Sequence, residues 1–141
     1  MHSEDTILLD DPQSGEWDVT VDVESWPQWA SAYQSVQRCE QGPFVVGSAA
    51  LIKQRGLPLT KWEVTSLTPG ERFKWETQTC GIYMIATHEL ITRETGTEGV
   101  LRIELCGLIA RLLWPLTARL VRRALEQENA SLKCRCEEHK R

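Results

Sequence analysis

Alternation of apolar and polar residues through the middle of the chain constrains its fold more than any other feature. Trp62 and Val64, for example, alternate with the charged residues Lys61 and Glu63. Successive side chains of a β-strand point to opposite faces of a sheet, so this pattern predicts strands with one apolar face and one polar face. The same parity predicts further apolar-face positions at Ala50, Ile52, Gln54, Phe73, Trp75, Met84, Ala86, His88, Leu90, Leu101, Ile103 and Leu105.

Turn-forming residues interrupt this pattern at short intervals. Short breaks rich in Gly and Pro between strands are typical of hairpins, so the segments predict an antiparallel meander. A further short strand is expected from Glu4 to Asp10, before the turn at Asp11 and Pro12. The breaks lie at Gln41-Gly42-Pro43, Gly56-Leu57-Pro58, Thr68-Pro69-Gly70, Cys80-Gly81 and Thr95-Gly96-Thr97.

One long helix is expected from Leu108 to about Cys136, and it is the natural cover for the apolar face of the sheet. Roughly 29 helical residues extend about 43 Å, which is enough to cross a sheet. Pro115 predicts a bend near Trp114, because proline removes a helical hydrogen bond. At helical spacing the apolar stripe shifts between the two halves. It comprises Ile109, Leu112, Leu113, Leu116 and Leu120, then Val121, Ala124, Leu125, Glu128 and Leu132.

Two short helices are expected between the first strand and the meander. The segment from Pro12 to Asp22 favours a weak helix, and the segment from Glu24 to Trp29 favours another. In the second helix Ser25 is suited to the N-cap and Pro27 to the first turn. The large rings of Trp26 and Trp29 are expected to anchor the core, with ligand contact as the alternative.

The composition favours one domain, residues 1–141, in the cytoplasm. A chain of 141 residues has the size of one ordinary domain, and its net charge of −4 argues against nucleic acid as a partner. The cluster of Arg119, Arg122 and Arg123 is expected to be a solvated helix face. No secretory signal is visible at the N-terminus. The longest apolar stretch, 105–116, is shorter than the ~20 residues that span a membrane.

The five cysteines point to free thiols rather than to a disulfide framework. Their number is odd, they are scattered, and no secretion signal accompanies them. Cys134, Cys136 and His139 have the side-chain types of metal ligands, but one Cys-x-Cys without a second pair is a weak zinc signal. Neither a metal nor a cofactor is therefore expected.

The stretch from Asp22 to Trp29, which reads Asp-Val-Glu-Ser-Trp-Pro-Gln-Trp, is the most specific motif of the chain. With the residues that follow it, the chain resembles the polyketide cyclase/dehydrase-like branch of the START-like, SRPBCC superfamily. The likeness extends from about Thr6 to Glu137 and departs from the family pattern at 12–17. The later residues that carry it are Gly47, Gln54, Trp62-Glu63-Val64-Thr65, Phe73-Lys74-Trp75, Gly81, His88 and Leu132-Lys133.

The resemblance implies an α+β helix-grip fold. In this fold a strand, two short helices and six further strands precede a C-terminal helix, and the curved seven-stranded antiparallel sheet wraps around that helix. A hydrophobic cavity between sheet and helix is implied as well. The scaffold alone does not decide the activity, so function has to be argued from the cavity.

The expected ligand pocket combines apolar walls with a few polar side chains. His88 faces the apolar side and is the candidate acid or base, although a lone inward histidine is also a common core residue. Gln54 offers an amide donor and acceptor. Glu128 would have a raised pKa if it is desolvated, and exposure is its simpler alternative. The other expected pocket residues are Ile52, Trp62, Val64, Phe73, Trp75, Leu90, Ile103, Leu112, Leu116 and Leu120.

Three functions follow from this pocket. The first is binding or transport of a small hydrophobic, lipid-like or aromatic molecule. The second is a polyketide-type cyclase or dehydratase that moves protons through polar pocket groups. In the third, the domain's own side chains fill the pocket and the protein acts through a surface, as a homodimer for example. No common hydrolase, nucleotide or zinc-protease motif occurs, so a binding protein is favoured over an enzyme.

Overall fold

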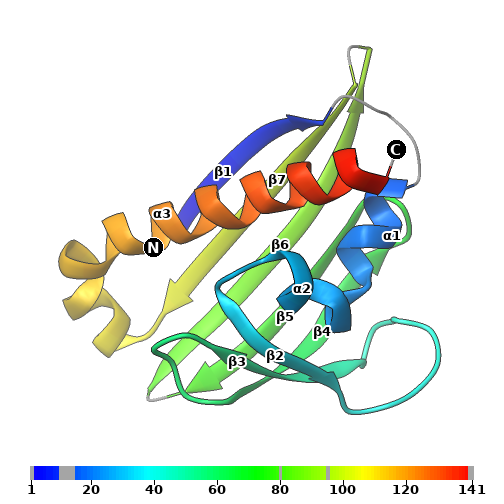
Figure 1. Cartoon of the computed structure of the whole chain (residues 1–141). Helices are drawn as coiled ribbons and strands as arrows, with labels where there is room; N and C mark the ends of the chain where they lie inside the picture. Colours follow the sequence, from blue (N-terminus) through cyan, green and yellow to red (C-terminus); the bar gives the residue numbers. More distant parts are fainter. Residues whose placement is uncertain (1, 10–14, 80, 95, 140–141) are drawn as a thin grey trace.

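The computed structural model describes residues 2–9, 15–79, 81–94 and 96–139. Its framework is an antiparallel sheet of seven strands in the order β1-β7-β6-β5-β4-β3-β2 (Figure 1). The predicted meander is confirmed, because consecutive strands from β2 to β7 are neighbours and the first strand pairs with the last. The strands are β1 (His2–Leu9), β2 (Tyr33–Arg38), β3 (Ala49–Gln54), β4 (Thr60–Thr68), β5 (Arg72–Thr79), β6 (Ile82–Arg93) and β7 (Gly96–Cys106).

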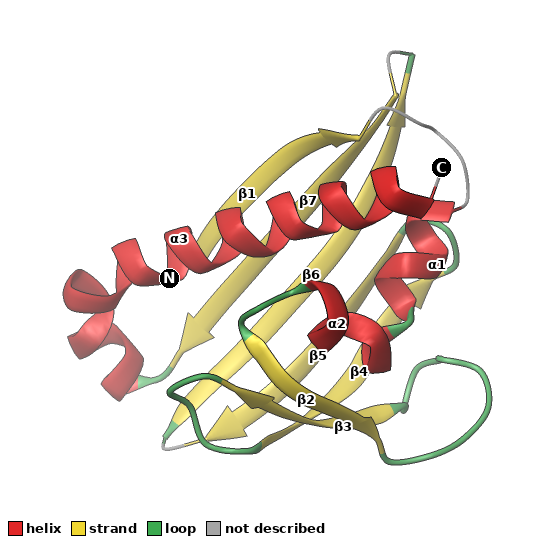
Figure 2. Ribbon diagram, viewed as in Figure 1, coloured by secondary structure: helices red, strands yellow, loops and turns green. Residues whose placement is uncertain are grey.

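Three short helical segments connect β1 to β2. They are α1 (Gly15–Val21), the 3₁₀ turn η1 (Val23–Ser25) and α2 (Trp26–Trp29). The expected start of the first helix, residues 12–14, lies outside the described residues. Ser25 occupies the N-cap of α2, but its hydroxyl does not cap that helix, because it donates a 2.8 Å hydrogen bond to the Asp22 carbonyl instead. Figure 2 shows α1 and α2 on the same side of the sheet as the long C-terminal helix.

The apolar face of the sheet holds an aromatic core. Trp62, Val64, Phe73 and Trp75 are all buried, as the alternation predicts. Trp26 lies at the centre of this cluster, 5.4 Å from Trp75 between ring centroids, and it is almost completely buried. The prediction that Trp26 anchors the core is therefore confirmed.

The long helix α3 (Leu108–His139) packs mainly against β1 and β7. Figure 1 shows its first turns, in yellow and gold, at an angle to the remainder, and Pro115 lies within this helix. The expected bend is thus present. None of the helices in the described ranges is both long and apolar enough to span a membrane.

The rotation of the first half of α3 differs from the prediction. Leu112, Leu116 and Leu120 were expected to face the sheet, but their exposed fractions are 69%, 76% and 64%. Ile109 and Leu113 are exposed as well, whereas Ala110 is buried. Ala110 is the one buried residue among 108–120, so periodicity identified the helix but assigned the wrong side of this half to the core.

Asn129 fixes the second half of α3 to the sheet. Its side-chain amide donates hydrogen bonds to the Gly99 carbonyl at 3.0 Å and to the Asp5 carboxylate at 3.0 Å. A Cβ at position 99 would lie 3.4 Å from Asn129 Oδ1, which is an ordinary van der Waals contact, so the hydrogen bond does not itself require glycine there. One buried amide therefore ties α3 to both β1 and β7.

Candidate functional site

The main cavity lies between the sheet and α3 and has a volume of about 180 Å³. Its walls are mostly apolar, since the sheet supplies two tryptophans and several aliphatic side chains. The expected pocket residues that line it are Ile52, Gln54, Trp62, Trp75, His88, Ile103 and Glu128. Other lining residues, which were not among the expected ones, are Tyr33, Leu57, Met84, Ala86, Leu101, Arg102, Leu105, Val121, Ala124 and Leu125.

The remaining expected residues lie elsewhere. Val64 and Phe73 are completely buried in the aromatic core and do not line this cavity. Leu90 lines a second, smaller cavity. The exposed Leu112, Leu116 and Leu120 of α3 are absent from both walls, because the helix presents Val121, Ala124 and Leu125 to the main cavity instead.

A tyrosine and a glutamate form the polar centre of the main cavity. The Tyr33 hydroxyl donates a 2.6 Å hydrogen bond to Glu128 Oε1, across 95 residues of sequence. Burial raises the pKa of Glu128 to about 7, although the hydrogen bond from Tyr33 opposes this shift. Burial first, and the neighbouring Glu128 charge second, raise the pKa of Tyr33 well above its usual range. Near pH 7 the Glu128 carboxyl group therefore gains or loses a proton, while the Tyr33 hydroxyl stays protonated and remains a donor.

His88 projects from β6 into the same region and is uncharged at neutral pH. Its ring stacks on Phe73, with 4.7 Å between centroids and 9° between planes, and it lies 5.1 Å from the ring of Trp26. Burial lowers the pKa of His88 to about 3. This neutral imidazole lines the main cavity, where it can meet a ligand.

The sequence pattern did not single out Tyr33, and the structure of β2 explains why. The pairing of β2 with β3 shifts register between Tyr33 and Ser35, which breaks strict alternation on this strand. The buried positions of β2 are consequently Tyr33 and Val36, three residues apart. The long-range contact with Glu128 has no local signal in the sequence.

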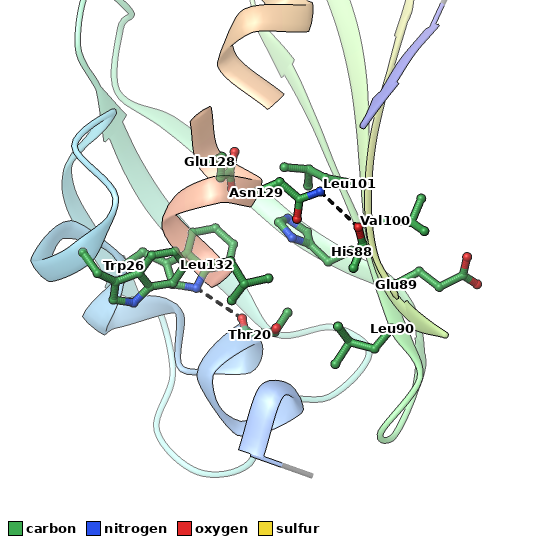
Figure 3. A pocket seen from close by; sticks show the side chains of 12 residues that line it. Thr20, Trp26, His88, Glu89, Leu90, Val100, Leu101, Glu128, Asn129 and Leu132 are labelled. Atoms are coloured by element: carbon green, nitrogen blue, oxygen red, sulfur yellow. Dashed lines mark hydrogen bonds between the residues drawn. The ribbon is translucent and has the colours of Figure 1, made fainter. Parts of the chain in front are cut away.

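The second cavity, whose lining Figure 3 shows, is smaller and shares His88 and Glu128 with the main cavity. Its volume is about 20 Å³, close to the ~10–15 Å³ that one water molecule needs. Thr20, Leu90 and Asn129 are among the residues that line it. This space is too small for an organic ligand, so the main cavity is the candidate site.

No metal centre is found among the described residues: no three His, Cys, Asp or Glu side chains there are grouped to hold an ion. Cys134 is exposed and Cys136 is buried. Residues two apart on a helix do not share a face, which accounts for this difference. Five polar side chains among the described residues line the main cavity, namely Tyr33, Gln54, His88, Arg102 and Glu128.

Solved structures share this architecture at low sequence identity. The ZhuI aromatase/cyclase from Streptomyces sp. R1128 has a TM-score of 0.81 and 15% identity, over 100% of this chain and 96% of that one. The di-domain aromatase/cyclase StfQ of the steffimycin biosynthetic pathway has a TM-score of 0.82 and 11% identity, over 99% of this chain and 52% of that one. TTHA0849 from Thermus thermophilus has a TM-score of 0.79 and 13% identity, over 100% of both chains. At these identities the likeness shows the fold alone.

The sequence itself identifies the family. None of the curated proteins matches the chain. The model of the family described as "Polyketide cyclase / dehydrase and lipid transport" matches residues 3–137, which is nearly the whole sequence. The chain therefore belongs to this family, within the START-like, SRPBCC superfamily of helix-grip proteins.

Proposed function

We propose that this protein binds a small hydrophobic molecule in the cavity between the sheet and α3. The observation that carries the proposal is the cavity itself, with about 180 Å³ inside mostly apolar walls. An engineered apolar cavity of roughly 150 Å³ in another protein is large enough to bind benzene. Fused aromatic rings or a short branched chain therefore match the space, and a longer molecule would have to extend through the opening.

The polar groups narrow the ligand class further. Tyr33, Gln54 and His88 offer hydrogen bonds to a carbonyl or hydroxyl group on an otherwise apolar molecule. Glu128 becomes negatively charged as the pH rises through about 7. Arg102 also lines the cavity, but its guanidinium already pairs with Glu104 at 3.4 Å. A carboxylate ligand would meet the Glu128 charge in a desolvated wall, so the site favours an uncharged ligand that carries one or two oxygens.

Native mass spectrometry of the purified protein tests this proposal. We expect a species heavier than the bare chain that loses a small apolar molecule on mild activation, or a bare chain that takes up one equivalent of an added aromatic compound. Release of nothing, together with no uptake of any apolar compound by the folded protein, would overturn the proposal.

A second candidate function is proton transfer in a cyclase or dehydratase reaction. The observation that favours it is the Tyr33–Glu128 pair, because a carboxyl group with a pKa of about 7 is suited to acid–base catalysis at neutral pH. His88, whose pKa is about 3, is a much weaker base at that pH. The candidate acid or base therefore moves from His88 to Glu128.

Turnover of a poly-β-ketone surrogate tests this second candidate. Glu128→Gln keeps an acceptor for the Tyr33 hydroxyl but cannot exchange a proton, so it should abolish product formation and leave surrogate binding within about twofold. Unchanged turnover in this variant would exclude Glu128 as the acid or base. If the wild type binds the surrogate without turning it over, proton transfer is excluded and the binding function remains.

A further inference from the structure

The first half of α3 exposes an apolar face that nothing in the described chain covers. Leu108, Leu112, Leu116 and Leu120 have exposed fractions between 64% and 76%, and they follow one another at i, i+4 spacing. Large exposed apolar patches on proteins mark sites of interaction with another surface. The opposite side of the same helix packs on the sheet, as the buried Ala110 and Leu125 show.

A second exposed apolar segment lies in the loop between β3 and β4. Leu57 and Leu59 have exposed fractions of 50% and 58%. Leu57 also lines the main cavity, and so do Val121 and Ala124 of α3. The loop and the helix therefore meet at the cavity, and Leu57 is the exposed leucine that lines its wall.

The charge of these two segments differs from the charge of the rest of the chain. The chain holds 16 basic and 20 acidic residues, yet segments 51–62 and 105–125 contain no acidic residue. Among the basic residues of the two segments, Arg122 is the one that forms an ion pair with a described residue. Its partner is Glu126, which lies just beyond the second segment. Four of the basic residues lie on α3, namely Arg111, Arg119, Arg122 and Arg123, and Arg55 lies in the loop. Lys53 and Lys61 belong to the polar face of the sheet.

We propose that this leucine and arginine surface, formed by the exposed side of 105–125 and by the loop that carries Leu57, docks onto an anionic lipid bilayer and brings the Leu57 edge of the cavity close to it. An amphipathic helix that carries leucines on one side and arginines at their border lies in the interface of a membrane. A cluster of about four to eight basic residues beside such a helix recognises anionic lipids. A docked protein can exchange a hydrophobic ligand with the bilayer. This exchange rests on the proposed binding function, whereas the docking itself does not.

A second copy of the chain is the competing occupant, and the charges disfavour it. In a two-fold symmetric dimer the same patch faces itself. The patch with Arg111, Arg119 and Arg123 of one copy would then face the same positively charged patch of the other, with no acidic side chain from 105–125 to neutralise it. An anionic lipid surface instead complements both the leucines and the arginines.

Co-sedimentation of the full chain with vesicles tests the proposal. We expect the protein to bind vesicles of phosphatidylcholine and phosphatidylglycerol, to bind phosphatidylcholine alone more weakly, and to dissociate as salt is added. The double variant Leu112→Ser and Leu116→Ser should reduce binding at least roughly tenfold, because two leucines no longer enter the interface. Both side chains are exposed, so the substitutions leave the core intact.

The matched control is Val45→Ser with Val46→Ser. These valines have exposed fractions of 49% and 58%, and their loop lies across the molecule from the first turns of α3 in Figure 1. The control should bind vesicles as the wild type does, and both double variants should keep the wild-type affinity for an apolar probe in solution. Loss of probe binding would argue against the proposed binding function and would leave the docking proposal unaffected.

Three results would overturn the docking proposal. The first is a wild type that binds neither vesicle at low salt. The second is a Leu112→Ser, Leu116→Ser variant that binds as well as the wild type. The third is a wild type that does not bind vesicles and is a dimer in sedimentation equilibrium, while the Leu112→Ser, Leu116→Ser variant is a monomer. That result would identify the surface as a contact between two copies.

Discussion

Glu128 and His88 lie in the wall of the same cavity, and burial shifts their pKa values in opposite directions. The pKa of Glu128 rises from 4.5 to about 7, so the folded protein holds an extra proton in that range. The contribution of Glu128 to the free energy of unfolding is therefore complete below pH 4.5 and is lost as the pH rises through 7. The pKa of His88 falls from 6.5 to about 3, so its contribution is complete above pH 6.5 and is lost as the pH falls toward 3.

Between pH 4.5 and 6.5 the two contributions therefore oppose each other. Glu128→Gln removes the contribution that decreases as the pH rises. The free energy of unfolding of this variant should therefore rise with pH more steeply than that of the wild type. The difference in slope is at most about 1.4 kcal/mol per pH unit. Urea unfolding at several pH values in this window measures it. Parallel curves for variant and wild type would show that Glu128 does not titrate differently in the folded state.

His88→Phe provides the complementary variant. It retains an aromatic ring for stacking against Phe73 and removes the titrating group. Relative to the wild type, its free energy of unfolding should fall as the pH rises from 4.5 to 6.5, because the contribution of Glu128 is then unopposed. A flat difference over this window would contradict the low pKa of His88.

At the scale of elements, Asn129 connects α3 with the two edge-side strands β1 and β7. Asn129→Ala should lower the free energy of unfolding by about 1–3 kcal/mol, because it leaves the buried Gly99 carbonyl without this donor. Gln127→Ala is the matched control, since that exposed amide bonds only to the Ser31 hydroxyl and its loss should change stability by less than about 0.5 kcal/mol. Equal losses in the two variants, measured by urea unfolding, would contradict the anchoring role of Asn129.

Sequence reasoning predicted most of the elements because their signals are local. Alternation identifies strands β3 to β7, and Pro115 together with the shift of the apolar stripe indicates the bend of α3. The rotation of α3 could not be predicted in the same way. Periodicity assumes that the most apolar side of a helix is buried, and here the leucines of the first half face outward while Ala110 packs inward.

The candidate site was predicted only in part, for a related reason. Trp62, Trp75 and Ile103 line the cavity because their strands alternate regularly. Tyr33 lies on a strand with a register shift, and its bond to Glu128 joins segments 95 residues apart. Contacts of this kind depend on tertiary packing, for which a single sequence provides no periodic signal.

At the scale of the whole molecule, the sheet and α3 enclose space instead of filling it. Two buried alanines allow this property to be tested. Ala86 lines the main cavity, whereas Ala50 is buried in the aromatic core and lines none of the cavities described above. Ala86→Leu should therefore place its added carbons in empty space, and Ala50→Leu should overpack the core and destabilise the fold by about 1–3 kcal/mol.

Fluorescence titration with the neutral probe N-phenyl-1-naphthylamine shows whether the space between the sheet and α3 binds an apolar molecule. We expect saturable binding of one probe per wild-type chain. In Ala86→Leu we expect at least roughly tenfold weaker binding, because the leucine occupies part of the 180 Å³, and an unfolding midpoint no lower than that of the wild type. A wild type without saturable binding, or a stable Ala86→Leu variant that binds the probe equally well, would contradict a ligand site between the sheet and α3.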